Sequence, residues 1–382
     1  MHVVSKRQKV LIVGMADSVH LARWLSQFSR SSIDFELFPS SPHRRLHPNI
    51  KSLTFATNQT MTLRIQPSIM RSVAFPLSAL DLVFRNIFRA ALLRRTIRTG
   101  NFDIIHVLEL QHAGYLLLDT HLTSRLPTLC ITNWGSDIYW YQRFPQHKSR
   151  IVELLQLADV YSAECHRDIE IVLQLGYTGK IRPVIPNSGG IDLTKIDSAI
   201  EPPSRRRRVM VKGYTGFVGQ AITALRACEL AASHLRGYEV TLYSASAKAR
   251  LFAWKLRYFR GVKIKILRKR TPHDVMLRHF SESRVYLGVS LSDGISTSLL
   301  ESMATGCYPI QTRTSCGAEW VRSDSGSLIP HDDVEAIATE LIAALTDDTK
   351  VDEACRINRL IVEARASDSV VSEIASDFYQ FD

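Results

Sequence analysis

Short apolar runs alternate with segments of helical periodicity along most of the chain. Runs of about four to eight apolar residues are typical of strands buried in a parallel sheet. An amphipathic segment follows the first run, with Leu21, Leu25 and Phe28 at helical spacing. Strands that alternate with helices predict an α/β fold with doubly wound parallel sheets. The predicted strands span residues 10–13, 102–107, 127–132, 158–163, 209–211, 240–244, 262–267, 285–289 and 308–312.

The chain has 382 residues, and because a domain averages roughly 150 residues, two domains are expected. Two breaks in the pattern mark the junction between them, namely the Pro-Asn-Ser-Gly-Gly segment at 186–190 and the Glu-Pro-Pro segment at 201–203. Such clusters are typical of linkers. We therefore predict Rossmann-like domains at 1–188 and 189–365. A helix within 366–382 is predicted to pack back on the N-terminal domain.

The first predicted strand runs into a polar turn that begins at Gly14. In open α/β sheets the turns after the strands face the edge at which ligands bind. Asp17, Ser18 and His20 either face a ligand there or cap the helix that follows. Capping does not require a histidine, which favours a functional turn. The turn lacks a G-x-G-x-x-G pattern, so a dinucleotide-binding fingerprint is not supported.

Two further strands of the first domain are followed by polar residues. His112 comes after the 102–107 strand, and Trp134 and Asp137 come after the 127–132 strand. Polar residues just after a strand are well placed for a ligand-binding cleft. We predict that these residues line such a cleft together with the Gly14 turn.

The second domain opens with a strand that leads into Lys212 and a glycine-rich turn that contains Gly216 and Gly219. A lysine beside such a turn suits a diphosphate, because its ammonium group is a compact positive charge with several donors. This turn is therefore predicted to bind a phosphorylated ligand.

The most informative segment is the strand, turn and helix over residues 285–306. The first amides of a helix have no partners within it, so this arrangement forms an anion site. Asp293 lies in the turn and Glu301 on the helix. If the helix begins near Ile295, Glu301 is about six residues in, or roughly 9 Å along the axis. Ser298 and Glu301 also fit a capping box, in which the glutamate only closes the helix start.

The formal net charge of +11 predicts attraction to anions. Residues 67–100 combine apolar residues at helical spacing with six arginines. A basic amphipathic helix can lie on an anionic membrane surface, and the alternative is a helix packed on the sheet with a solvated basic face. The basic run at 205–208 is expected to be solvated. Within 67–100, no aromatic-interleaved basic motif predicts a nucleic-acid partner.

The apolar runs are too short for a signal peptide or for a membrane span. The six cysteines form no C-x-x-C pair, so neither a zinc site nor a disulfide framework is indicated. We therefore expect a cytoplasmic protein with reduced thiols that binds peripherally at the inner face of the membrane.

The segment Ser-Asp-Gly-Ile-Ser-Thr-Ser-Leu-Leu-Glu-Ser-Met-Ala-Thr-Gly at 292–306 resembles the E-x7-E segment of the retaining GT-B glycosyltransferases of family 4, also called glycosyl transferases group 1. The resemblance extends over nearly the whole chain. It implies two Rossmann-like, doubly wound domains that face a central cleft, with the acceptor bound by the first and the donor by the second. Further similar segments are 14–20, 133–137, 186–192 and 212–219.

The resemblance also implies roles for individual residues. Asp293 would contact the transferred sugar, Glu301 the donor ribose, and Lys212 would offset the charge of the leaving phosphate. With His20, Asp293 and Lys212 are the predicted catalytic residues. The predicted donor-binding residues are Gly216, Gly219, Leu267, Arg268, Lys269, Gly294, Ile295, Ser296, Thr297, Ser298 and Glu301. The predicted acceptor-side residues are Gly14, Asp17, Ser18, His112, Trp134 and Asp137.

The sequence thus predicts a retaining, hexosyltransferase-type enzyme. Its donor would be a nucleotide-diphosphate sugar of UDP or GDP type, and its acceptor a glycan or a polyprenyl or other lipid-linked hydroxyl in cell-surface polysaccharide biosynthesis. No D-x-D motif occurs, so neither a metal nor a cofactor is expected. Two alternatives stay open. One is a non-catalytic nucleotide-sugar-binding or membrane-associated protein, favoured by Trp134 and Gln220, which depart from the family pattern. The other is a nucleotide-sugar epimerase of the same architecture.

Overall fold

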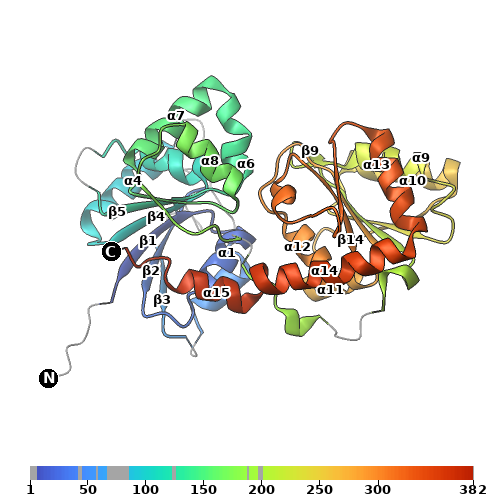
Figure 1. Cartoon of the computed structure of the whole chain (residues 1–382). Helices are drawn as coiled ribbons and strands as arrows, with labels where there is room; N and C mark the ends of the chain where they lie inside the picture. The colour runs from blue at the N-terminus through green and yellow to red at the C-terminus, as the bar shows by residue number, and fades with distance from the viewer. Residues whose placement is uncertain are drawn as a thin grey trace. The chain divides into compact units, whose positions relative to one another are not determined.

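The computed structural model describes residues 7–41, 45–56, 59–66, 86–122, 126–186, 189–196 and 201–381. The chain divides into two compact units. The first unit comprises Met1–Gly189 together with Val371–Asp382, and the second comprises Gly190–Val370. Figure 1 traces the chain through both units by colour.

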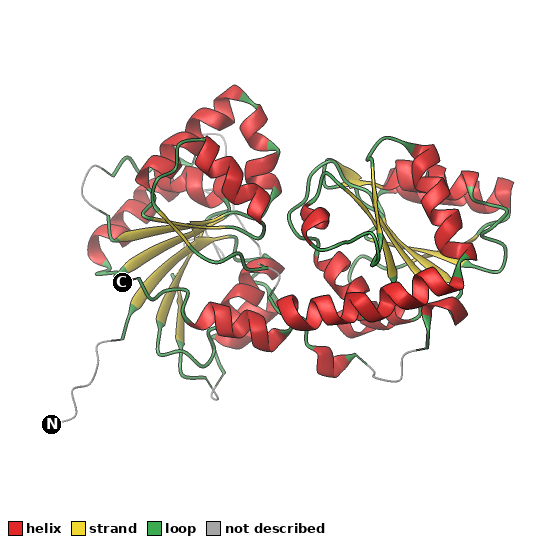
Figure 2. Ribbon diagram, viewed as in Figure 1, coloured by secondary structure: helices red, strands yellow, loops and turns green. Residues whose placement is uncertain are grey.

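The first unit is built on a seven-stranded parallel sheet with the strand order β3-β2-β1-β4-β5-β6-β7. Helices cover both faces of this sheet (Figure 2). The strands are β1 (Lys9–Gly14), β2 (Asp34–Pro39), β3 (Thr62–Ile65), β4 (Ile104–Leu108), β5 (Thr128–Thr132), β6 (Val160–Ser162) and β7 (Lys180–Ile181). The helices are α1 (Val19–Ser26), α2 (Pro48–Leu53), α4 (Ile87–Thr99), α5 (Tyr115–Leu118), α6 (Ser136–Tyr139), α7 (Pro145–Leu157), α8 (His166–Gln174) and α15 (Asp368–Ser376), the last of which enters this unit from the second.

Strand β1 shows why this sheet must be covered on both sides. Successive side chains of a strand point to opposite faces. Leu11 and Val13 pack into one hydrophobic core, whereas Val10 and Ile12 pack into the core on the other face. A continuous apolar run therefore forms a strand with two buried faces, as expected for a parallel sheet.

The end of the chain is anchored in the first unit by Tyr379. Its hydroxyl lies 2.7 Å from Nδ1 of His106 on β4 and accepts a 3.1 Å hydrogen bond from the Trp24 indole on α1. His106 is fully buried, and burial lowers its pKa to about 3, so its ring is neutral. Nε2 of His106 lies 2.7 Å from the Thr132 hydroxyl, so the tail supplies the partner of the second ring nitrogen.

Helix α4 is the described part of the basic region predicted at 67–100, of which residues 67–85 lie outside the described residues. Arg89, predicted on the basic face, is instead buried, because its guanidinium donates a 2.8 Å hydrogen bond to the Ser40 carbonyl at the end of β2. Ile87 and Phe88, predicted on the apolar face, are exposed. The helix packs on the core through Ala90, Leu93 and Ile97.

The second unit contains a six-stranded parallel sheet with the order β12-β11-β8-β13-β14-β15. Helices again lie on both faces (Figure 2). The strands are β8 (Arg208–Lys212), β11 (Glu239–Tyr243), β12 (Lys263–Ile266), β13 (Val285–Gly288), β14 (Tyr308–Thr312) and β15 (Ser327–Ile329), with a separate hairpin of β9 (Thr215–Gly216) and β10 (Gly219–Gln220). The helices are α9 (Ala221–Leu230), α10 (Ala247–Arg260), α11 (His273–Ser281), α12 (Thr297–Ala304), α13 (Val334–Thr346) and α14 (Asp348–Ala366).

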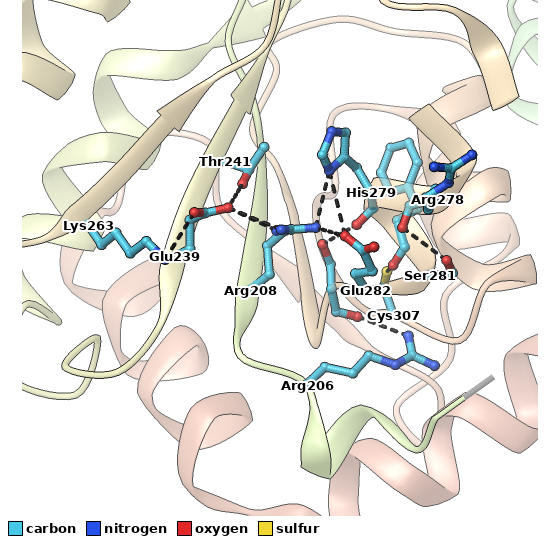
Figure 3. A network of polar contacts seen from close by, with 12 residues as sticks. Arg206, Arg208, Glu239, Thr241, Lys263, Arg278, His279, Ser281, Glu282 and Cys307 are labelled. Atoms are coloured by element: carbon cyan, nitrogen blue, oxygen red, sulfur yellow. Dashed lines mark hydrogen bonds and ion pairs between the residues drawn. The ribbon is translucent and has the colours of Figure 1, made fainter. Parts of the chain in front are cut away.

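A polar network fixes the amino-terminal edge of the second sheet (Figure 3). Arg208, which begins β8, lies 3.2 Å from the Glu239 carboxylate at the start of β11. Lys263, which begins β12, lies 3.3 Å from the same carboxylate. Burial alone would raise the pKa of Glu239, but the hydrogen bond from Lys263 and the charge of Arg208 lower it. Three neighbouring strands are thereby joined through one ionised group.

The basic run at 205–208 is not a solvated segment throughout. Arg206 is buried and donates two 3.0 Å hydrogen bonds, to the carbonyls of Ser283 and Thr305. Its guanidinium thus pairs two backbone carbonyls, one just before β13 and one just after α12, that lie outside regular secondary structure. The prediction of a solvated run is therefore wrong for this arginine.

The prediction of an α/β fold with two doubly wound parallel sheets is confirmed. Each predicted strand has a counterpart in the structure. The sequence pattern missed β2, β3, β7 and β15 of the two sheets, and it described the hairpin strands β9 and β10 only as a glycine-rich turn.

Candidate active site

The strand order of the second unit marks where a ligand is expected. From β8 the chain adds β11 and then β12 on one side of the sheet, and it then crosses to the other side to form β13, β14 and β15. Strands β8 and β13 are hydrogen-bonded neighbours. They therefore form the topological switch point, outside whose carboxyl ends open α/β sheets bind ligands.

Lys212 and Asp293 meet at this switch point. Lys212 is the last residue of β8, and Asp293 lies in the turn after β13. The Lys212 Nζ donates a 2.5 Å hydrogen bond to Asp293 Oδ2, with the side chains only 7% and 22% exposed. Burial alone would lower the pKa of Lys212, but the Asp293 carboxylate more than offsets this, so the pKa is raised. The site thus holds a charged ammonium group in a largely buried position.

The glycine-rich hairpin is held against the turn that carries Asp293. The amides of Leu291 and Ser292 donate to the Phe217 carbonyl, at 2.9 and 3.0 Å. Gly216 has a φ of 116°, a conformation that favours glycine. At Gly219 a Cβ atom would lie 2.5 Å from the Tyr214 Cβ, so only glycine fits this close approach. Both predicted glycines are therefore required by the shape of the hairpin.

Helix α12 begins at Thr297, with Ser296 at the N-cap position. The start lies two residues after the predicted one, which places Glu301 about 6 Å along the axis. Ser298 is inside the helix and Ser296 makes no side-chain capping bond, so the capping box is not formed. In the described part of the chain, no hydrogen bond involves the amides of Thr297 or Ser298. These donors are available to an anion.

Glu301 is buried, and Oε1 of its carboxylate lies 2.6 Å from Nε2 of His273, the first residue of α11. His273 was not among the predicted site residues. Its signal was present but weak, since Pro272 and Asp274 around it are ordinary helix-start residues. The pairing orients the Glu301 carboxylate from a second helix.

The remaining predicted donor residues occupy the same edge of the sheet. Gly294 and Ile295 are buried in the turn before α12. Leu267 follows β12 and is buried, with its amide bonded to the Leu242 carbonyl of β11 at 2.8 Å. Arg268 and Lys269, which come next, are exposed. This loop stands two strands away from β8, at the carboxyl edge.

The first unit has an equivalent switch point, between β1 and β4. Gly14 ends β1, and Ser18 caps α1 by accepting a 3.1 Å hydrogen bond from the His20 amide. The ring centroids of His20 and Trp134 lie 5.3 Å apart. Asp17, which precedes Ser18, is exposed. The structure therefore combines a helix cap with a histidine–tryptophan contact that capping does not require.

A short π-helix, Leu110–Gly114, follows β4 at this edge. Glu109 precedes it with a φ of 82°, and its carboxylate accepts hydrogen bonds from the amides of Gln111 and His112, at 2.8 and 2.7 Å. The hydrogen bond to Glu109 also raises the pKa of the His112 imidazole. Strained backbone of this kind concentrates at functional sites. Glu109 was not among the predicted site residues, and its backbone conformation could not be read from the sequence.

Asp137 joins the loops that follow β4 and β5. Its carboxylate is buried and accepts hydrogen bonds from the amides of Trp134, at 2.8 Å, and Leu110, at 3.2 Å. Burial and the Glu109 carboxylate raise its pKa to about 8, against the effect of the two amides. The predicted role as a cleft-lining residue therefore needs correction, since both oxygens are engaged in holding two loops in place.

We expect the stability contributed by Asp137 to depend on pH. Its pKa is 3.8 for the free side chain and about 8 in the fold, so the folded state retains a proton that the unfolded state has lost. This contribution to the free energy of unfolding is complete below the lower value and is lost as pH rises through the upper one. Urea unfolding of the wild type and Asp137→Asn between pH 6 and 9 should show a wild-type advantage that shrinks toward pH 9. Asp159→Asn, which removes the charge of an exposed carboxylate that accepts from the Leu129 amide, is the control. A constant difference across this range for Asp137→Asn would contradict the assignment.

Two family models match the chain. "Glycosyl transferase 4-like" matches residues 9–162, and "Glycosyl transferases group 1" matches residues 231–347. The chain belongs to the group 1, family 4-like glycosyltransferases. The first match covers β1 to β6, and the second covers β11 to β15 with the Asp293 turn and α12. Strands β7 and β8, Lys212 and the glycine-rich hairpin lie outside both matches.

Solved structures give the fold of this glycosyltransferase. Sucrose-phosphate synthase from Thermosynechococcus elongatus has a TM-score of 0.73 at 13% identity, covering 98% of each chain. Anabaena HepE in complex with UDP and glucose has a TM-score of 0.69 at 15% identity, covering 98% of this chain and all of that one (100%). The lipopolysaccharide outer core galactosyltransferase WaaB has a TM-score of 0.69 at 15% identity, covering 97% and 98%. A search of curated proteins finds no match. The predicted family and the GT-B fold are confirmed.

Proposed function

We propose that this glycosyltransferase moves a hexose from a nucleotide-diphosphate sugar to a hydroxyl group, with retention at the anomeric carbon and without a bound metal. The observation that carries the proposal is the buried Lys212–Asp293 pair beside the start of α12. A lysine, free helix amides and a close glycine hairpin converge where a diphosphate would lie. HepE, which shares the fold, has been solved with UDP-glucose, which supports a UDP-type donor.

The proposed reaction uses preorganised electrostatics. Lys212 and the amides of Thr297 and Ser298 stabilise the negative charge that grows on the leaving phosphate. Asp293 orients Lys212 and contacts the transferred sugar, and Glu301 holds the ribose. The bond between the anomeric carbon and the phosphate breaks on the face that the acceptor hydroxyl attacks. The departing phosphate takes the acceptor proton, so no protein nucleophile is needed.

The acceptor is proposed to be a glycan or a polyprenyl or other lipid-linked hydroxyl used in cell-surface polysaccharide. The residues proposed to contact the acceptor are Gly14, Asp17, Ser18, His20, His112 and Trp134. The basic region at 67–100 would bring the enzyme to the inner face of the membrane, and Ile87 and Phe88 at the start of α4 are exposed as such a contact requires. Among the described residues, no helix has the length and apolar character of a membrane span.

The proposal is tested by nucleotide binding and donor turnover. UDP or GDP at 100 times its Kd should raise the free energy of unfolding by about 2.7 kcal/mol. The matching sugar nucleotide should then be slowly hydrolysed without acceptor. Stabilisation without hydrolysis or transfer would instead favour a non-catalytic binding protein. No response to any nucleoside diphosphate would contradict the proposal.

A further inference from the structure

Helix α10 of the second unit has a buried face and an exposed apolar face. Ala249, Ala253 and Leu256 pack into the core. On the outside, Leu251, Trp254 and Tyr258 are 58%, 55% and 72% exposed. Their spacing of three and four residues places them in one stripe along the helix. Nothing in the proposed sugar transfer uses this stripe.

The aromatic residues of the stripe form a cluster of their own. The rings of Trp254 and Tyr258 stack, with centroids 5.6 Å apart and planes 13° from parallel. Phe259 packs edge-on against Tyr258 at 5.1 Å and is 69% exposed. Soluble proteins rarely leave contiguous apolar surface of this kind without a partner. The cluster therefore marks a contact surface.

The charges on helix α10 have one sign, and one of them, Arg260, is paired with Glu229 of α9 at 2.9 Å. Helix α10 contains no acidic residue and five basic ones, which are Lys248, Arg250, Lys255, Arg257 and Arg260. Residues seven apart lie nearly two turns apart on the same side of a helix. Arg250 and Arg257 thus border one side of the stripe, and Lys248 and Lys255 border the other. In the part of the chain that the structure describes, no ion pair involves Lys248, Lys255 or Arg257.

We propose that the exposed face of α10 docks on an anionic membrane surface. An aromatic stripe of modest length with basic residues on both borders is the pattern of a helix lying in the plane of the lipid headgroups. Trp and Tyr prefer that depth, and the stems of Lys and Arg can extend from it toward the phosphates. The absence of acidic residues on α10 matches a negative surface.

A protein partner fits this face less well. Protein interfaces are enriched in Trp, Tyr and Arg but depleted in Lys. Lys248 and Lys255 lie beside the stripe, where a protein interface would have to desolvate them. A headgroup layer leaves them hydrated and close to phosphate. The inference rests on α10 alone and is independent of the 67–100 region and of the proposed sugar transfer.

The test is co-sedimentation of the full chain with vesicles. Vesicles of phosphatidylcholine with one-third phosphatidylglycerol should bind the protein, and vesicles of phosphatidylcholine alone should not. The double variant Lys248→Glu/Lys255→Glu should weaken binding by about tenfold or more. Arg356→Glu on α14, an exposed basic residue of the same unit, is the charge control. Trp254→Ser/Tyr258→Ser should weaken binding similarly, with Leu360→Ser as the control, since Leu360 is 61% exposed on α14.

Fluorescence quenching tests whether Trp254 of α10 enters the membrane. Brominated acyl chains should quench tryptophan emission of the bound protein, and Trp254→Phe should lose that quenching while still binding. All variants should keep the wild-type melting temperature and nucleotide response, because the substituted side chains are exposed. Failure to bind anionic vesicles would overturn the proposal. Vesicle binding that the α10 variants do not weaken would also overturn it. The same holds if an RNA or an acidic protein binds this face of α10 and vesicles do not.

Discussion

Replacing Lys212 by methionine should lower turnover by about 100- to 1,000-fold, the loss typical of removing one preorganised stabilising donor from an active site. Methionine retains the length and packing of the side chain but carries no charge. The leaving phosphate would then lose the nearest buried cation, while the hairpin and the α12 amides stay in place. The measurement is kcat with saturating donor, together with the Kd of the nucleoside diphosphate.

The control for this substitution is Lys263→Met. Lys263 is also an ion-paired lysine of the second sheet, but it lies at the amino-terminal edge and is 74% exposed. It should leave kcat unchanged. If Lys212→Met retained wild-type turnover, the leaving group would not be stabilised at the β8–β13 switch point.

The same pair predicts an asymmetry in stability. After Lys212→Met, the Asp293 carboxylate remains 22% exposed and can be hydrated. After Asp293→Ala, the buried Lys212 ammonium is left without its carboxylate, which costs about 3 kcal/mol in such cases. Asp293→Ala should therefore lose stability as well as turnover.

The sequence predicts strands well where both faces are buried. Strands β1 and β13 contain continuous apolar runs, and β4 is apolar except for the buried His106, because helices cover both sides of them. Strand β2 was missed because Asp34 and Glu36 interrupt its apolar run. Strands β7 and β15 have two and three residues, too few to show any period. Strand β2 pairs with β1, and the hairpin strands β9 and β10 lie at the candidate site, so the missed strands are not remote from it. The site was still located because Gly14, Lys212 and Asp293 end or follow strands that were predicted.

The limits of prediction at the site have a different origin. Asp293 and Lys212 were selected from the turns that follow their strands, but only tertiary structure shows that their side chains pair. Glu301 was compatible with a capping box until the helix start was located at Thr297. Arg89 was assigned to an exposed basic helix face and Arg206 to a solvated run, because charge is usually exposed. Each is buried by hydrogen bonds to carbonyls far away in sequence, which no local pattern encodes.

Replacing Glu301 by alanine should weaken nucleotide binding by about 10- to 150-fold, which corresponds to the 1.5–3 kcal/mol of a hydrogen bond to a charged group. Glu301 is buried, and its proposed partners are the ribose hydroxyls of the donor. Turnover at saturating donor should change much less, because the ribose is bound equally in the ground state and the transition state. Glu363→Ala, an exposed glutamate of α14, is the control and should change neither quantity.

Removing the ribose hydroxyls from the nucleotide tests the Glu301–ribose contact directly. The wild type should bind a 2′,3′-dideoxynucleoside diphosphate more weakly than the normal ribonucleotide, and Glu301→Ala should bind the two almost equally. The coupling free energy between the protein substitution and the removal of the hydroxyls measures the Glu301–ribose contact. A general effect of the substitution on α12 cancels in this comparison. His273→Ala, which removes the neighbour that orients Glu301 at 2.6 Å, should reduce this discrimination without abolishing it. If Glu301→Ala discriminated between the ribonucleotide and its dideoxy analogue as strongly as the wild type, the carboxylate would not bind the ribose. Its burial would then reflect contacts within the protein, such as that with His273, and not a ligand.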